Sequence, residues 1–143
     1  MGKELFKTVP FGLPLEPTPE PFGPRRHGAA LRRYGMTRWA DMFTARQLLA
    51  LGTFVRHTRA IKAEMQVEGY PLVWIEAVTA YLALAIDRIV DRGSMVCHWD
   101  MGYEKISNTF AGFRFSMSWD FAETNVVGLS TGSYDGQLEW IAQ

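Results

Sequence analysis

The residues best suited to chemistry gather in the second half of the chain. They are Cys97, His98, Asp100, Glu104, Asp120 and Glu123. Imidazole and carboxylate groups bind divalent metals, and a thiol beside an imidazole base can act as a nucleophile. Neighbouring side chains on an extended segment point in opposite directions, so Cys97 and His98 are poorly placed to meet. The spacing of the acids matches no metal-ligand pattern. We therefore predict that Cys97 is a small buried residue, and we assign no metal ligand and no catalytic residue.

Glycine-rich loops for binding phosphate groups are also missing from the sequence. Neither a G-x-G-x-x-G turn nor a P-loop occurs, although close backbone approach to a phosphate needs such a turn between a strand and a helix. Gly128, Gly132 and Gly136 lie in a polar stretch and are interpreted as turn residues. We therefore assign no cofactor-binding residue to this chain.

The strongest physical sign of a ligand is a basic region in the first half of the chain. This basic region covers residues 25–62. It contains nine cations and the single acid Asp41, which gives it a net charge of +8. The cations are Arg25, Arg26, Arg32, Arg33, Arg38, Arg46, Arg56, Arg59 and Lys62. Clustered arginines are typical of proteins that contact the phosphate backbone of nucleic acids. Tyr34, Trp39 and Phe43 lie among them and could stack on unpaired bases.

A second interpretation of the basic region needs no ligand. The whole chain has a net charge of zero, so the rest of it carries −8. The arginines could therefore pair with the acidic second half, within one chain or between subunits. In that case Trp39 and Phe43 are ordinary core residues.

Two long helices are predicted in the middle of the chain, and they must position most of these side chains. Thr44 followed by Gln47 is a capping-box pattern, so a helix should begin at Ala45 and continue to the stop signals Gly69 and Pro71. Pro71 is suited to the start of a second helix, which is apolar over residues 72–86 and ends before Gly93. This stretch of fifteen residues, apolar except for Glu76 and Thr79, is too short to span a bilayer, which needs about 20 residues. We expect this helix to be buried on most sides.

The remaining segments complete a mainly α fold. Six prolines between positions 10 and 24 predict an extended proline-rich arm over residues 1–30, followed by a single helical domain over residues 31–143. Beyond the two long antiparallel helices we expect several short helices, over residues 103–110, over residues 119–124 after Ser118, and from the cap Ser133 to Ala142. Residues 113–117 alternate in polarity, which is typical of a short strand.

Length and composition narrow the class of protein. A chain of 143 residues with 48% hydrophobic residues can form one packed domain. Cys97 is the only cysteine, which excludes an intramolecular disulfide and favours a reducing compartment. The first ten residues lack the features of a secretory signal. We expect a cytoplasmic protein without a membrane partner.

Four ordered strings resemble one internal segment of the large adenine-specific DNA methylases that begin with the domain of unknown function 1156. The first runs from Arg33-Tyr34-Gly35-Met36 through Trp39-Ala40-Asp41 to Phe43-Thr44-Ala45-Arg46-Gln47-Leu48-Leu49-Ala50-Leu51. The second joins Tyr81-Leu82-Ala83-Leu84-Ala85-Ile86-Asp87-Arg88 to Cys97-His98-Trp99-Asp100. The third joins Glu104-Lys105-Ile106-Ser107-Asn108-Thr109-Phe110 to Trp119-Asp120-Phe121-Ala122-Glu123-Thr124-Asn125, and the fourth is Leu138-Glu139-Trp140-Ile141-Ala142. The resemblance covers nearly everything from Arg33 onward.

The resemblance implies an accessory region of a methylase, because the parts that perform the chemistry are missing. The family's Phe-x-Gly-x-Gly loop for S-adenosylmethionine and its Asp-Pro-Pro-Tyr motif do not occur, and no proline follows Pro71. S-adenosylmethionine is thus expected only for a complete family member. The polar and aromatic positions that match the family are expected to form a buried network or to line a groove. They are Trp99, Asp100, Glu104, Lys105, Asn108, Trp119, Asp120, Glu123 and Asn125.

Two hypotheses of different class follow. The first is a non-catalytic, methylase-related module that contacts DNA or a methylase catalytic domain through its basic region. The alternative is a structural module that forms a homodimer, because the chain is electrically polarised and one small domain has difficulty in covering the long apolar helix. A cut domain, a split subunit and a shortened gene would all fit the sequence.

Overall fold

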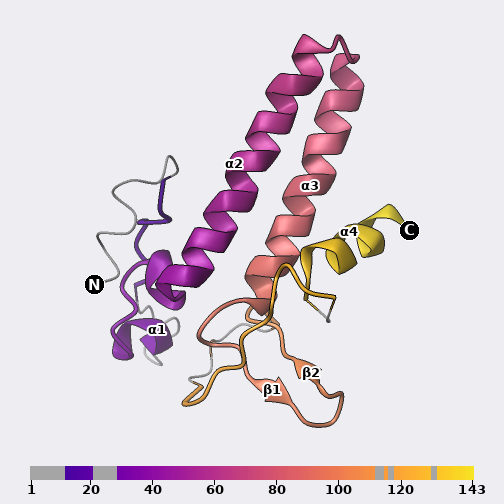
Figure 1. Ribbon diagram of the computed structural model, residues 1–143. Coiled ribbons are helices and arrows are strands. Elements are labelled where there is room, and N and C mark those ends of the chain that lie inside the picture. The colour runs from indigo at the N-terminus through magenta and orange to yellow at the C-terminus, as the bar shows by residue number, and fades with distance from the viewer. Residues whose placement is uncertain (1–11, 21–28, 112–114, 116–117, 130–131) are drawn as a thin grey trace.

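The fold is mainly helical, with a small sheet of two strands. The computed structural model describes residues 12–20, 29–111, 115, 118–129 and 132–143 (Figure 1). In chain order its elements are α1 (Ala29–Arg33), the short 3₁₀ helix η2 (Trp39–Met42), α2 (Ala45–Val67), α3 (Leu72–Arg92), β1 (Trp99–Asp100), β2 (Lys105–Ile106) and α4 (Tyr134–Ala142). α2 and α3 lie side by side, and α4 packs against α3 near the sheet (Figure 1).

α2 begins at the residue that the capping box predicts. The Gln47 amide donates to the Thr44 hydroxyl oxygen over 3.3 Å, and the Thr44 amide donates to Gln47 Oε1 over 2.8 Å. Both donors are backbone amides at the start of the helix, where no carbonyl of the helix itself can accept from them. The N-terminus of the longest helix is therefore fixed by residues three positions apart.

The chain reverses direction within four residues at the other end of α2. The Gly69 amide donates to the Gln66 carbonyl and the Tyr70 amide donates to the Met65 carbonyl, a Schellman motif. Gly69 has φ +80°, a conformation that a residue without Cβ adopts at low cost. Pro71 follows as the N-cap of α3. These two stop and start signals send α3 back along α2 (Figure 1).

The open end of this helix pair is closed by a small core. Leu31, Met42 and Val96 form one buried cluster, so the segments before α2 and after α3 meet there. The Met95 amide also donates to the Met42 carbonyl over 2.8 Å. Just behind this cluster Cys97 is fully buried, with its Sγ 3.0 Å from Thr109 Oγ1, which confirms the prediction of a buried cysteine.

The helix expected over residues 103–110 is wrong. That region contains β2, which pairs antiparallel with β1 in the register Trp99 to Ile106 and Asp100 to Lys105. The physical reason is the Asp100 carboxylate, which accepts hydrogen bonds from the amides of Gly102 and Tyr103 and so stabilises a turn. A local side-chain bond of this kind competes successfully with helix formation.

Of three other short elements that the sequence predicts, one is absent, one lies largely outside the described residues and one is present. No helix forms over residues 119–124, because the Ser118 hydroxyl donates to the Asp120 carbonyl instead of capping a turn. The strand expected over residues 113–117 lies largely outside the described residues. α4 does begin after its predicted cap, with the Gly136 amide donating to Ser133 Oγ over 3.3 Å.

The expectation that the second long helix is buried on most sides is also wrong. Its buried hydrophobic residues are Ile75, Ala85, Ile86 and Ile89. Its exposed large hydrophobic residues are Leu72, Val73, Trp74, Tyr81 and Leu84. Only α2 and α4 pack on α3 closely, so one long side of this apolar helix has no cover within the described part of the chain. No helix in that part is both long and apolar enough to cross a membrane.

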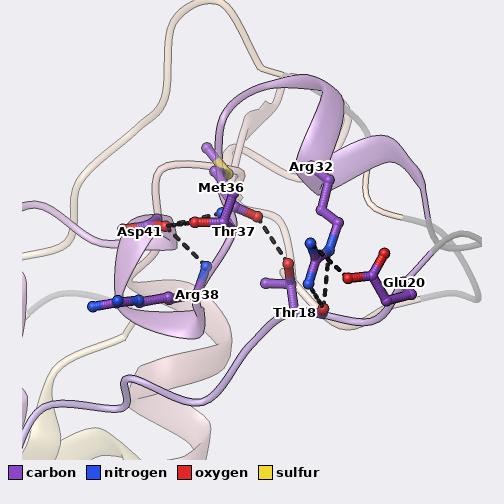
Figure 2. A network of polar contacts seen from close by, with 7 residues as sticks. All are labelled: Thr18, Glu20, Arg32, Met36, Thr37, Arg38 and Asp41. Atoms are coloured by element: carbon purple, nitrogen blue, oxygen red, sulfur yellow. Dashed lines mark hydrogen bonds and ion pairs between the residues drawn. The ribbon is translucent and has the colours of Figure 1, made fainter.

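Residues 14–18 lie along the segment that leads into η2. The Ala40 amide donates to the Pro14 carbonyl, the Trp39 amide to Glu16 and the Thr18 amide to Thr37. Thr18 is buried, and its hydroxyl donates to the Met36 carbonyl over 2.9 Å (Figure 2). This part of the proline-containing segment therefore packs on the helical domain.

Loss of the α2 cap should destabilise the whole protein. Thr44→Ala removes the hydroxyl acceptor at the N-terminus of the helix and should lower the free energy of unfolding by about 0.5–2 kcal/mol. Chemical denaturation followed by circular dichroism measures this change. Thr53→Ala is the matched control, because the Thr53 hydroxyl donates only to the Leu49 carbonyl within the same helix. An equal loss in both variants would contradict the role of the cap.

Ionisation of Tyr134 should lower the free energy of unfolding of the protein at alkaline pH. Its ring stacks on Phe54 of α2 at 4.4 Å, and this burial, with the Asp135 carboxylate, raises the pKa of Tyr134 above 10.0 despite the opposite effect of Thr58. The folded state thus favours the neutral phenol. The resulting stability is present below pH 10 and is lost as the pH rises through the raised value.

The Tyr134→Phe variant should keep the stack and lose this pH dependence. Its free energy of unfolding should fall less between about pH 9 and 11 than that of the unmodified protein. Tyr103→Phe, at an exposed tyrosine of the sheet loop, should retain the full decrease. Identical pH profiles for all three proteins would show that Tyr134 is not the titrating group.

Candidate nucleic-acid interface

The predicted basic residues that the structure describes divide into two groups according to whether they form an ion pair within the chain. Arg25 and Arg26 lie outside the described residues. Arg32 and Arg46 each form an ion pair with an acid. Arg33, Arg38, Arg56, Arg59 and Lys62 form no ion pair with another described residue. The second group carries the candidate interface.

Arg32 has a structural role. Its Nε and Nη2 donate to the Thr18 carbonyl over 3.1 and 2.8 Å, and its Nη1 lies 2.9 Å from Glu20 Oε1 (Figure 2). The guanidinium therefore attaches residues 18–20 to α1. Because its fork of donors is already used, we remove Arg32 from the candidate interface.

Asp41, the only acid in the basic region, is also used locally. Its Oδ2 accepts hydrogen bonds from the amides of Thr37 and Arg38 and from the Thr37 hydroxyl, at 2.9, 2.9 and 3.2 Å (Figure 2). These bonds cap η2. The Arg38 side chain extends away from this network (Figure 2), so Asp41 does not neutralise it directly.

Arg46 pairs with the acidic half of the chain. Its Nε lies 2.7 and 2.9 Å from the two carboxylate oxygens of Glu123, and its Nη2 also donates to that carboxylate. The hydrogen bonds and the negative charge raise the pKa of Arg46. At this position the second interpretation of the basic region holds, since an arginine of α2 binds an acid 77 residues later.

The remaining cations of α2 form what we term the α2 basic flank, defined as Arg56, Arg59 and Lys62. All three side chains are exposed, and they follow one another at three-residue intervals over about 9 Å of helix. This part of the α2–α3 pair extends beyond α1, the sheet and α4 (Figure 1). Asp87 of α3 lines the same shallow groove as Arg59, without an ion pair between them. The flank is accessible to a large anionic partner.

The aromatic residues expected to stack on bases are mostly not available. Trp39 and Phe43 pack against the core cluster, and the Trp39 ring meets Phe115 edge-on at 6.3 Å. The structure thus favours the alternative in which both are core residues. Tyr34 is exposed and remains available. With two of three aromatics buried or half-buried, the region is better suited to the phosphate backbone than to unpaired bases.

The nine positions that match the methylase family do not form one buried network. Trp99, Asp100, Glu104 and Lys105 lie in or between the two strands, where Lys105 Nζ is 4.7 Å from the centre of the Tyr103 ring. Asn108, Trp119 and Asp120 are exposed. Glu123 and Asn125 line a cavity of about 180 Å³, which they share with Arg46, Gln47 and Thr124.

The cavity lined by Glu123 contains two polar groups without partners. Gln47 Nε2 and Thr124 Oγ1 are buried without a hydrogen bond. A space of this size can hold water molecules that satisfy such groups. The cavity gives the acidic segment a polar contact with α2, and nothing in its lining resembles a catalytic group set.

Sequence reasoning missed one polar pair on the sheet. Ser107 Oγ lies 2.8 Å from His98 Nδ1 and also accepts the His98 amide hydrogen over 3.1 Å. The pair is exposed, and no described acid bonds to the second ring nitrogen, so it fixes the strand pairing without the orientation that a catalytic dyad needs. His98 faces solvent and Cys97 faces the core, as alternation along an extended segment predicts. Among the described residues, no three His, Cys, Asp or Glu side chains gather where they could hold a metal ion.

Sequence reasoning anticipated that one small domain has difficulty in covering α3, but it did not identify which side of this helix stays exposed. The signal that could have found it is the spacing of Trp74, Ala77, Tyr81 and Leu84, which places four apolar residues on one stripe of the helix. The stripe is difficult to recognise in the sequence because apolar residues occur on every side of this helix.

Comparison of the chain with protein-family models, with curated proteins and with solved structures gives no match.

The two neighbouring arginines of α1 should differ sharply in their effect on stability. Arg32→Ala removes three donor contacts to residues 18–20 and should lower the free energy of unfolding by about 1–3 kcal/mol. Arg33→Ala, at an exposed position, is the control and should change it by less than about 0.5 kcal/mol. Urea denaturation of both variants tests this. Equal losses would mean that the Arg32 contacts contribute nothing specific.

Proposed function

We propose that this chain is a non-catalytic helical module related to adenine-specific DNA methylases, and that it contacts the phosphate backbone of DNA. The contact is made by the α2 basic flank, with Arg33 and Arg38 as additional cations. In this proposal the two long helices act as an antiparallel hairpin that presents the flank. The proline-rich segment that precedes α1 (Ala29–Arg33) carries Arg25 and Arg26 as further cations.

The observation that carries the proposal is that none of these five cations forms an ion pair with an acid among the described residues. The one polar side-chain contact described in the flank joins Arg56 Nη2 to His57 Nε2 over 3.3 Å, and an imidazole supplies no negative charge. Arg32 and Arg46 find acids within the chain, which shows that pairing was geometrically available to arginines of the same region. The α2 basic flank instead points to solvent, where a DNA phosphate could replace the counterions. Backbone contacts of this type give affinity without reading a base sequence.

The proposed role excludes methyl transfer by this chain alone. Adenine methylation requires a flipped base and a bound methyl donor held in line with it. The sequence has neither the cofactor loop nor the Asp-Pro-Pro-Tyr motif of the family that it resembles. In this proposal a catalytic domain supplies the chemistry, and the helical module adds affinity for the DNA.

Titration into labelled duplex DNA at several salt concentrations tests the proposal. The binding constant should fall as salt rises, because binding releases counterions from the phosphates. Each phosphate contact contributes about 0.9 to the slope of log K against log salt. The double variant Arg56→Ala/Arg59→Ala should therefore bind more weakly and lower this slope by about 1.8.

Arg46→Ala is the matched control, because it removes one positive charge from the same helix at a residue that already pairs with Glu123. It should change the slope by much less than either Arg56→Ala or Arg59→Ala. Binding without salt dependence, or equal effects of all three single variants, would contradict contact through the flank. Absence of any DNA binding would leave a protein surface as the partner of these cations.

A further inference from the structure

The outward side of α3 is an apolar surface that no described part of the chain covers. Trp74, Tyr81 and Leu84 are 64%, 55% and 52% exposed, and the small residues Ala77 and Ala80 between them are exposed as well. Trp and Tyr side chains bury about 150–250 Å² each when covered, so Trp74 and Tyr81 alone expose roughly 180–300 Å². With the aliphatic residues this surface reaches the size of the largest apolar patches on monomeric proteins, which are often interaction sites.

The face has the spacing of a helix-pairing seam. Trp74, Ala77, Tyr81 and Leu84 follow one another at intervals of three, four and three residues, the a and d pattern of helices that pack side by side. The only charged residue between positions 72 and 86 is Glu76, which lies off this stripe. At the next position of the pattern Arg88 donates to Gln137 and lies 5.3 Å from the Trp140 ring, so α4 closes the seam.

We propose that a second copy of this chain packs on this face, with its own α3 antiparallel to the first. A twofold interface requires that if one residue contacts another, the reverse contact also occurs. The seam meets this requirement. In one register Trp74 lies opposite Leu84 of the second copy and Ala77 lies opposite Tyr81 of the second copy, and symmetry repeats both pairs.

Side-chain size favours this register. Each large tyrosine meets the small alanine of the other copy, which leaves room for the ring, and each tryptophan meets a leucine. Large residues opposite small ones allow two helices to approach at about 8–10 Å and to interdigitate. An unrelated partner would need no such reciprocity within a single helix, so the pattern favours a second copy as the occupant.

The resulting assembly is a bundle in which two α2–α3 pairs meet through their α3 helices. A stable interface needs about 800 Å² from each partner. Leu72 and Val73 at one end of the seam and Trp140 at the other extend the exposed apolar surface toward that size. Because the chain has a net charge of zero, there is no overall electrostatic repulsion between two copies.

This inference does not rest on DNA binding. The seam lies on the side of α3 away from the groove that Arg59 lines with Ala83 and Asp87, so a dimer leaves the α2 basic flank exposed. If both proposals hold, the dimer presents two such flanks to one DNA molecule. Each proposal is tested by its own experiment.

Sedimentation equilibrium of the full chain without DNA is the first test. The unmodified protein should be a dimer at micromolar concentrations. Ala77→Glu places a charge at the centre of the seam and should raise the dissociation constant at least about 30-fold. Ala60→Glu is the matched control, because Ala60 is an exposed alanine on α2 outside the seam, and it should remain dimeric. Circular dichroism and urea denaturation of each variant confirm that it folds.

Cysteine cross-linking tests the register. Because Cys97 is buried, a new surface cysteine is the reactive one. A mixture of Ala77→Cys and Tyr81→Cys chains should form a disulfide between unlike chains, whereas Ala77→Cys chains alone should not, since a disulfide needs Cα atoms within about 7 Å.

Three outcomes would overturn the inference. A strict monomer up to about 0.1 mM means that the face does not bind a second copy. A dimer that survives Ala77→Glu pairs through another surface. Efficient disulfide formation by Ala77→Cys chains alone contradicts the antiparallel register.

Discussion

The structure depends on the point where the chain entering α2 meets the chain leaving α3. Met42 is fully buried there between Leu31 and Val96, and its carbonyl accepts the amide hydrogen of Met95. The reversal at Gly69 joins the same two helices at their far end. With both ends held, the helices form a support to which the sheet, α4 and residues 14–18 attach close to the buried end (Figure 1).

The acids of this protein pair with some of the arginines and leave the others unpaired within the described residues. The basic region has one acid, and that acid caps a helical turn instead of pairing with an arginine side chain. Glu20 and Glu123 each hold one arginine against the body of the fold. The cations of the α2 basic flank are left for solvent or for a partner. A zero total charge therefore conceals a surface that is locally positive.

The apolar residues are distributed in a similarly unequal way. Among the described residues, eleven hydrophobic side chains are buried and seventeen large ones are exposed, so much of the apolar content does not contribute to the core. Burial of apolar surface is the main favourable term in folding and association. A chain that leaves a whole side of its most apolar helix uncovered gains further stability when a partner covers it. The α2 basic flank and the α3 seam lie on different sides of the helix pair, so the two kinds of contact are compatible.

Local signals in the sequence determined the long helices and the last one. Thr44 with Gln47, Gly69 with Pro71, and Ser133 act on neighbours within a few residues, so their effect can be read without knowing the fold. The sheet could not be predicted in this way. It depends on the Asp100 turn together with the bonds of Ser107 to His98 and of Thr109 to Asp91, which join residues 9 and 18 positions apart.

For the candidate site too, some features follow from the sequence alone and others depend on tertiary contacts. The sequence determined that positive charge gathers in one region, because charge is a property of composition. Only the tertiary structure decided which cations are available, since the acids that hold Arg32 and Arg46 lie 12 and 77 positions away. The same holds for the apolar face of α3. Hydrophobicity is fixed by the residues, and the spacing within α3 marks an apolar stripe, but whether that stripe is exposed depends on which elements pack against the helix.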